Sequence, residues 1–231
     1  QAMMRILPPP ALISRGKVII NNEDIMAAAE SDIINFRWKK ISIVMQSALN
    51  ALNPVLSIRE QIHDVLKIHK GLIGKEADNR AKELLSLVDI EYDPLESFPH
   101  QLSGGMRQRI VIAMALACKP KLLIADEPTT ALDVTIQAEI LSLLNRLKRE
   151  TGAAVLFITH DMSVVAQIAD RVVVMYNGEK VEEGSVNKIF SNPKMEYTKK
   201  LLASVPTLGA MRDKKFPEAM KLKDALGLDP I

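Results

Sequence analysis

The stretch LSGGMRQRIVIAMALACKPKLLIADEP, residues 102–128, decides the fold of this 231-residue chain. Serine is a favoured helix N-cap, so a helix is expected to begin after Ser103 and to run to about Cys118. The helix is apolar almost all round near its end, which indicates that it is buried. The apolar run 122–125 then predicts a strand of a parallel sheet that is covered on both faces.

The residues before this stretch predict a mainly helical block inside a mixed chain. Short strands are expected over 17–20 and 41–45, and residues 2–7 have the character of the last turns of a helix that ends before three prolines. Apolar residues then recur at helical spacing over 58–69 and 77–88, with two glycines between them. We expect a helical subdomain over about 55–118.

The residues after it return to alternating strands and helices. The predicted elements are a helix over 134–150, an apolar strand over 154–159, a helix over 162–168, and strands over 171–176 and 179–183. Asn177-Gly178 between the last two strands is a strong hairpin signal. Strand–helix–strand alternation implies right-handed crossovers on a parallel sheet, so the fold class is α/β with an inserted helical subdomain. Residues 207–231 are expected to form a polar tail.

Composition excludes several classes of protein. Hydrophobic residues make up 48% and charged residues 25% of the chain, and the net charge of +2 gives no argument for a nucleic-acid partner. Cys118 is the single cysteine, which excludes a disulfide framework and is expected to be a core residue. The longest apolar run, 110–118, is nine residues, short of the roughly 18 of a membrane span. With no secretory signal, these features predict a soluble cytosolic protein.

Two segments have the chemistry of a phosphate site. Asp126 and Glu127 follow a buried strand, where open α/β sheets bind their ligands. An aspartate there can hold Mg²⁺ through water, and a glutamate can orient and deprotonate an attacking water. Ser103-Gly104-Gly105 opens a helix, whose free amides favour phosphate. Taken singly, Asp126-Glu127 is better explained as an acidic turn after a strand and Ser103-Gly104-Gly105 as an ordinary capped helix.

Five segments in fixed order resemble the ATP-binding-cassette (ABC) ATPases. They are Gln46, residues 102–108, residues 122–127, Asp133 and His160. The resemblance implies a P-loop NTPase-like sheet core that binds ATP and Mg²⁺. It implies that Asp126 and Gln46 contact Mg²⁺ and that Glu127 is the catalytic base. His160 would contact the γ-phosphate; a structural histidine is the alternative.

The resemblance also divides the motifs between two subunits. The residues implied to bind or border the nucleotide of the opposite subunit are Ser103, Gly104, Gly105, Gln108 and Asp133. Met106 departs from the pattern, because many members have glutamine there. A second ABC ATPase subunit, identical or related, is therefore an implied partner.

Finer resemblance points to the dipeptide/oligopeptide importers. The segments that carry it are QSALNALNP (46–54), DEPTTALDVT (126–135) and YTKKLLASVP (197–206). The resemblance covers residues 1–206, with the importer-type C-terminal extension at about 186–206. It implies membrane permease subunits as partners, a solute-binding protein as an indirect one, and a position at the cytoplasmic face of the membrane. With no cysteine besides Cys118, we expect no iron–sulfur cluster. Peptides, nickel or sugars stay open as the solute.

No G-x-x-x-x-G-K-[ST] phosphate loop occurs in the 231 residues. In the family this loop precedes the helix that corresponds to residues 2–7, so we expect the chain to be truncated at its N-terminus and to be a poor ATPase alone. One alternative is a degenerate or scaffold subunit that only completes a partner's ATP site. Another is a soluble ABC ATPase of DNA repair or translation.

Overall fold

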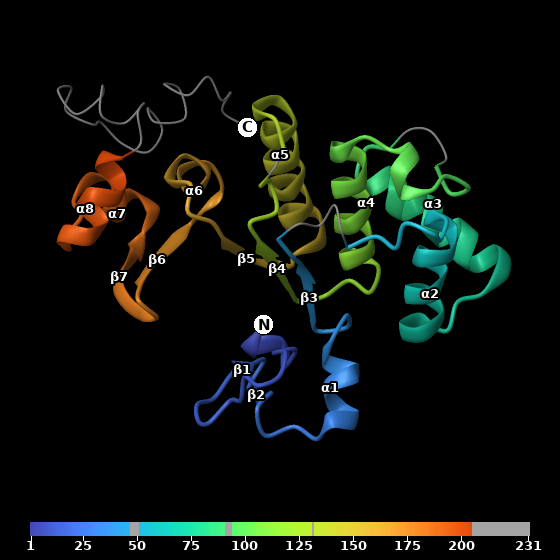
Figure 1. Cartoon of the computed structure of the whole chain (residues 1–231), viewed down its shortest axis with the longest axis horizontal. Coiled ribbons are helices and arrows are strands. Elements are labelled where there is room, and N and C mark those ends of the chain that lie inside the picture. Colours follow the sequence, from blue (N-terminus) through green and yellow to red (C-terminus); the bar gives the residue numbers. More distant parts are fainter. Residues whose placement is uncertain (47–50, 91–93, 131, 205–231) are drawn as a thin grey trace. The chain divides into compact units, whose positions relative to one another are not determined.

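The computed structural model describes residues 1–46, 51–90, 94–130 and 132–204, and it divides the chain into two compact units, Gln1–Ile158 and Thr159–Ile231 (Figure 1). The helices of the first unit are η1 (Ala2–Met4), α1 (Glu30–Phe36), α2 (Ile58–Lys70), α3 (Gly74–Leu87), η3 (Pro99–Gln101), α4 (Gly104–Leu116) and α5 (Val134–Thr151). Its strands are β1 (Ile19–Ile20), β2 (Glu23–Asp24), β3 (Ile41–Val44), β4 (Leu122–Asp126) and β5 (Ala154–Ile158). None of the described helices is both long and apolar enough to cross a membrane.

The centre of the first unit is a parallel sheet of three strands in the order β3-β4-β5. The register places Val44 beside Ala125 and Ala125 beside Phe157, so the three carboxyl ends meet at one edge. The predicted α/β class is confirmed. The interior of β4 is buried, as its apolar run predicted, whereas Leu156 and Ile158 of β5 are 38% and 44% exposed.

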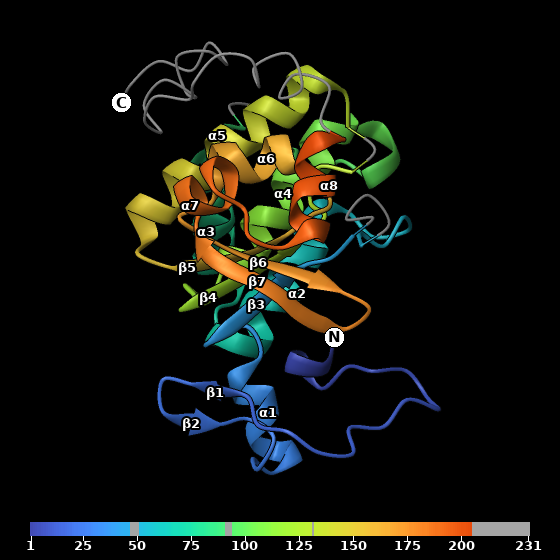
Figure 2. The same cartoon turned by 90° about the vertical axis from the view of Figure 1, so that its left-hand side faces the viewer.

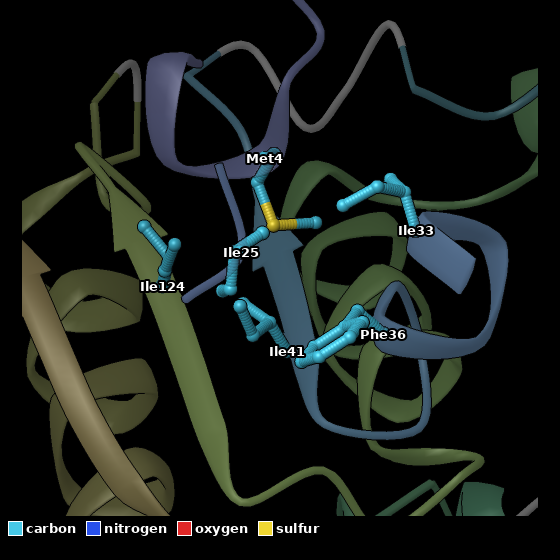
Figure 3. Close-up of a cluster of buried hydrophobic side chains, with 6 residues drawn as sticks. All are labelled: Met4, Ile25, Ile33, Phe36, Ile41 and Ile124. Atoms are coloured by element: carbon cyan, nitrogen blue, oxygen red, sulfur yellow. The ribbon is translucent and has the colours of Figure 1, made fainter. Parts of the chain in front are cut away.

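The first forty residues pack on the start of this sheet. Both views show β1, β2 and α1 below it, next to the end at which β3 begins (Figures 1 and 2). Apolar side chains of the first forty residues meet residues of β3 and β4 in one cluster (Figure 3), formed by Met4, Ile25, Ile33, Phe36, Ile41 and Ile124. The cluster joins five separate segments into one small core.

The N-terminal elements are shorter than the sequence predicts. The expected strand over 17–20 is reduced to the two residues of β1, whose antiparallel partner β2 is equally short. The expected helix end over 2–7 is the 3₁₀ turn η1, which ends where Arg5 takes a left-handed conformation (φ 50°). These two boundaries were wrong: β2 offers β1 only two residues to pair with, and the left-handed Arg5 ends η1 after a single turn.

The predicted helical block is present as α2, α3 and α4, which pack in sequence upon one another. A capping box fixes the start of α2: the Ser57 side chain accepts from the Glu60 amide, and Glu60 accepts from the Ser57 amide. Gly71 ends α2 in the left-handed conformation (φ 70°), which glycine adopts at little cost. The expected helix from 103 ends at Leu116, two residues earlier than predicted.

The second unit contains α6 (Met162–Ile168), β6 (Arg171–Tyr176), β7 (Glu179–Ser185), α7 (Val186–Ser191) and α8 (Glu196–Ala203). The predicted hairpin is confirmed: β6 and β7 pair antiparallel, and Asn177 and Gly178 both have positive φ (49° and 82°), as a type I′ turn requires. Its core includes Val172, Val174 and Ile189. The predicted polar tail at 207–231 lies outside the described residues.

Candidate functional site at the carboxyl edge of the sheet

The sheet brings Gln46 and Glu127 together, although 81 positions separate them in the chain. Val44, the last residue of β3, pairs with Ala125, so the residues two positions further along both strands reach the same edge. Gln46 Nε2 donates a hydrogen bond to Glu127 Oε2 at 2.8 Å. Two residues that the sequence assigned to one catalytic centre are thus in direct contact.

The backbone holds Glu127 in a conformation that side-chain-bearing residues rarely adopt. Its φ is 44°, and a left-handed non-glycine residue costs about 1–2 kcal/mol. Two hydrogen bonds stabilise it, from the Glu127 amide to the Ile158 carbonyl at 2.9 Å and from the Thr130 amide to the Glu127 carbonyl at 3.2 Å. Strain that the surrounding structure maintains in this way is a feature of functional sites.

A second side chain orients the same carboxylate oxygen. Thr130 Oγ1 donates to Glu127 Oε2 at 3.1 Å, beside the bond from Gln46. Thr130 was not among the predicted site residues. A hydroxyl three residues after the acid, in a tight turn, was the signal that could have found it.

Asp126 and Gln46 supply oxygen donors that suit magnesium. Asp126 is the last residue of β4 and is half-buried at the same edge. Because the Gln46 amide nitrogen donates to Glu127, its amide oxygen is left to accept or to coordinate. Magnesium is commonly held by one or two protein oxygens, with water and phosphate completing the shell. Within the described ranges there is no group of three or more His, Cys, Asp or Glu side chains that could hold a metal ion.

Residues 102–108, here called the signature segment, lead into α4 as expected. Ser103 is the N-cap, and its Oγ accepts from the Met106 amide at 3.3 Å. Gly104 and Gly105 are the first two residues of the helix, where amides have no intrahelical acceptor. Gln108 is only 2% exposed, and its Nε2 has no hydrogen-bond partner among the described residues. The side chain of Gln108 therefore lies inside the fold, not at the exposed start of the helix.

The remaining two predicted site residues are Asp133 and His160. Asp133 is the N-cap of α5, and its Oδ1 accepts from the Ile136 amide at 2.9 Å. His160 belongs to the second unit, where it immediately precedes Asp161, the N-cap of α6. Gln46, Asp126 and Glu127 thus form the group that the structure brings together within the first unit.

Comparison with protein families matches the chain in two places. Residues 1–130 match the family described as "ABC transporter". Residues 181–226 match the "Oligopeptide/dipeptide transporter, C-terminal region".

Curated relatives carry the names of transport ATP-binding proteins. The chain is 49% identical to the oligopeptide transport ATP-binding protein OppD of Bacillus subtilis, over 90% of this chain and 59% of that protein. It is 49% identical to the dipeptide transport ATP-binding protein DppD of the same organism, over 90% and 63%. It is 48% identical to the glutathione import ATP-binding protein GsiA of Salmonella typhimurium, over 97% and 37%. The chain thus spans between about a third and two thirds of the length of these relatives.

Solved structures of similar fold are ABC cassettes. One is the dimeric post-hydrolysis state of the cassette MJ0796 bound to ADP and Pi, 32% identical, with a TM-score of 0.65 over 75% of this chain and 74% of that one. Another is cbiO1 from Clostridium perfringens, 29% identical, with a TM-score of 0.72 over 92% and 80%. The ABC transporter match alone covers more than half of the residues, and the chain belongs to the ABC transporter family.

Proposed function

We propose that this chain is the ATP-binding and ATP-hydrolysing subunit of an importer in the oligopeptide/dipeptide group. The observation that carries the proposal is the hydrogen bond from Gln46 to Glu127 at the carboxyl edge of the sheet. The names of the relatives OppD and DppD, together with the match of residues 181–226, support the importer group.

In this proposal Glu127 is the base that activates water. Attack of the water on the γ-phosphorus forms a new P–O bond and breaks the bond to the ADP oxygen, and the water proton passes to the Glu127 carboxylate. The bonds from Gln46 and Thr130 to Oε2 hold that carboxylate in place before the substrate arrives. Asp126 and Gln46 would hold magnesium, which would supply positive charge to neutralise the phosphates.

The other predicted motifs lie in other segments of the chain and would act at the phosphates or at the contact between subunits. The amides at the start of α4 would bind the γ-phosphate of a nucleotide held by a second ATPase subunit. His160 would contact the γ-phosphate of the chain's own site, and Asp133 would border the seam between subunits. The dimeric state of the MJ0796 cassette supports this division between two subunits.

The proposed partners are the second ATPase subunit, membrane permease subunits at the cytoplasmic face, and indirectly a solute-binding protein. The domain that performs this work would span 1–206, with the helical subdomain at about 55–118 and the importer-type extension at about 186–206. Peptides are the solute class that the relatives' names favour.

A glutamine at position 127 tests the proposal, because glutamine keeps the hydrogen bonds but cannot accept a proton. The variant Glu127→Gln should be measured in the protein as its gene encodes it, reconstituted with its partner subunits. We expect ATP turnover to fall by about 100-fold or more, with nucleotide binding retained. Glu179→Gln, at an exposed position in β7, is the matched control. Equal turnover in Glu127→Gln and wild type would contradict the catalytic role and favour a scaffold subunit.

A further inference from the structure

Gly105 has a packing reason to be glycine that is separate from phosphate binding. A Cβ placed on Gly105 would lie 2.9 Å from Cγ2 of Ile136 and 3.5 Å from its Cδ1. The first distance is well below carbon–carbon contact distance. A methyl group at position 105 therefore cannot be accommodated unless Ile136 or one of the two helices moves.

Ile136 cannot step aside easily. Its Cγ2 methyl is bonded directly to Cβ, so rotation about χ2 leaves it in place, and β-branched side chains in a helix have one strongly preferred χ1. Ile136 lies in the first turn of α5 and is half-buried. The methyl therefore keeps a fixed position relative to the backbone of α5.

Two further contacts make this position a junction between the two helix starts. The Ile136 amide donates to Asp133 Oδ1, so the same residue caps α5 and contacts α4. One turn further along both helices, Arg109 Nη2 pairs with Glu139 Oε2 at 2.9 Å. Positions 105 and 109 of α4 thus meet positions 136 and 139 of α5 along one seam.

We propose that Ile136 is a positioning residue for the signature segment: its Cγ2 methyl, resting on the bare α-carbon of Gly105, fixes the amides at the start of α4 relative to Asp133. The two segments that face the partner's nucleotide then move as one piece. This inference rests on the proposed function, because that function assigns both segments to the partner's ATP site.

The test introduces a steric clash with one substitution and removes it with a second. Gly105→Ala should push α4 away from α5 and raise the KM for ATP about tenfold in the reconstituted full-length protein. Overpacking of this kind is expected to weaken ATP binding by about one factor of ten. Adding Ile136→Leu removes Cγ2 but keeps the side-chain volume, and it should restore most of the lost affinity. Adding Ile136→Val keeps Cγ2, so Gly105→Ala with Ile136→Val should stay defective.

The pattern of rescue decides the proposal. Rescue by leucine and not by valine supports it, whereas rescue by both, by neither, or a normal KM in Gly105→Ala overturns it. Ile136→Ala removes the Cγ2 contact with Gly105 without introducing a clash. It should raise the KM for ATP about threefold, and thermal unfolding should show that the variant is folded. An unchanged KM in Ile136→Ala also counts against the proposal. Glu127→Gln is measured in parallel. If this variant does not lower ATP turnover, the proposed function is wrong. The rescue pattern is then judged on nucleotide binding alone.

Discussion

At the scale of single residues, Glu127 is held by three parts of the chain, two at its carboxylate and one at its backbone amide. Gln46 and Thr130 donate to Oε2, and the Ile158 carbonyl of the neighbouring strand accepts from the Glu127 amide. A base that is fixed before its substrate binds loses little orientational entropy at the moment of reaction. Thr130 contributes to both parts of Glu127: its amide donates to the Glu127 carbonyl, and its hydroxyl donates to the carboxylate.

Thr130 offers a test of this orientation without a change in the base itself. Thr130→Val removes one hydrogen bond to a charged group, which contributes about 1.5 kcal/mol or more, so turnover should fall roughly tenfold. The KM for ATP should not change, because in the proposed mechanism Thr130 contacts the Glu127 carboxylate and not the nucleotide. Steady-state ATPase assays of the reconstituted protein measure both values.

Thr130→Ser is the matched control, because serine keeps the hydroxyl and loses only the methyl group. Since Thr130 is exposed, neither substitution should affect folding. If the valine and serine variants lose turnover equally, the hydroxyl has no role in orienting Glu127.

At the scale of secondary-structure elements, the loop before β3 contacts the end of α2 through two rings. The rings of Trp38 and His69 stack with centroids 5.3 Å apart, and Trp38 has a left-handed φ of 69°. Burial, and secondarily the charge of Lys39, lower the pKa of His69 below its ordinary value of 6.5. The folded protein therefore favours the neutral imidazole at this contact.

This pKa direction predicts how acid affects stability. Between the folded and unfolded pKa values of His69 the unfolded chain binds more protons, so the free energy of unfolding falls as pH drops through about 6.5. Urea unfolding should show this loss between about pH 7.5 and pH 5.5. His69→Phe keeps a ring against Trp38 and removes the titration, so the loss of stability with acid should be smaller in the variant. An identical pH dependence in the two proteins would exclude His69 as the source.

The elements that sequence alone predicted well are those with local signals at their ends. Ser57, Ser103 and Asp133 begin helices at the expected positions, and Asn177-Gly178 forms the expected turn. Contacts between distant segments carried no such signal. The core around Ile25 and the contact of Gly105 with Ile136 depend on tertiary packing, which spacing along the chain does not encode. The same holds for Thr130 at Glu127, whereas the meeting of Gln46 with Glu127 followed from the family pattern.

At the scale of the whole molecule, the proposed sites are shared between two subunits, so the position of two defects in a dimer should matter more than their number. Each site would combine Glu127 of one subunit with the signature segment of the other. In a dimer of two differently tagged copies, Glu127→Gln in one copy and Gly105→Ala in the other fall in the same site. The second site then has both components intact.

Placing both substitutions in one copy has the opposite effect, because each site then contains one defect. At ATP concentrations well below the wild-type KM, and for sites that act independently, we expect the first arrangement to retain about half of the wild-type turnover and the second to retain about a tenth or less. ATPase assays of dimers purified through both tags measure the difference, and a dimer with Glu127→Gln in one copy only gives the reference. Equal turnover in the two arrangements would show that the start of α4 does not complete the partner's site. The two dimers carry the same two substitutions, so they differ only in how the defects are distributed between the copies.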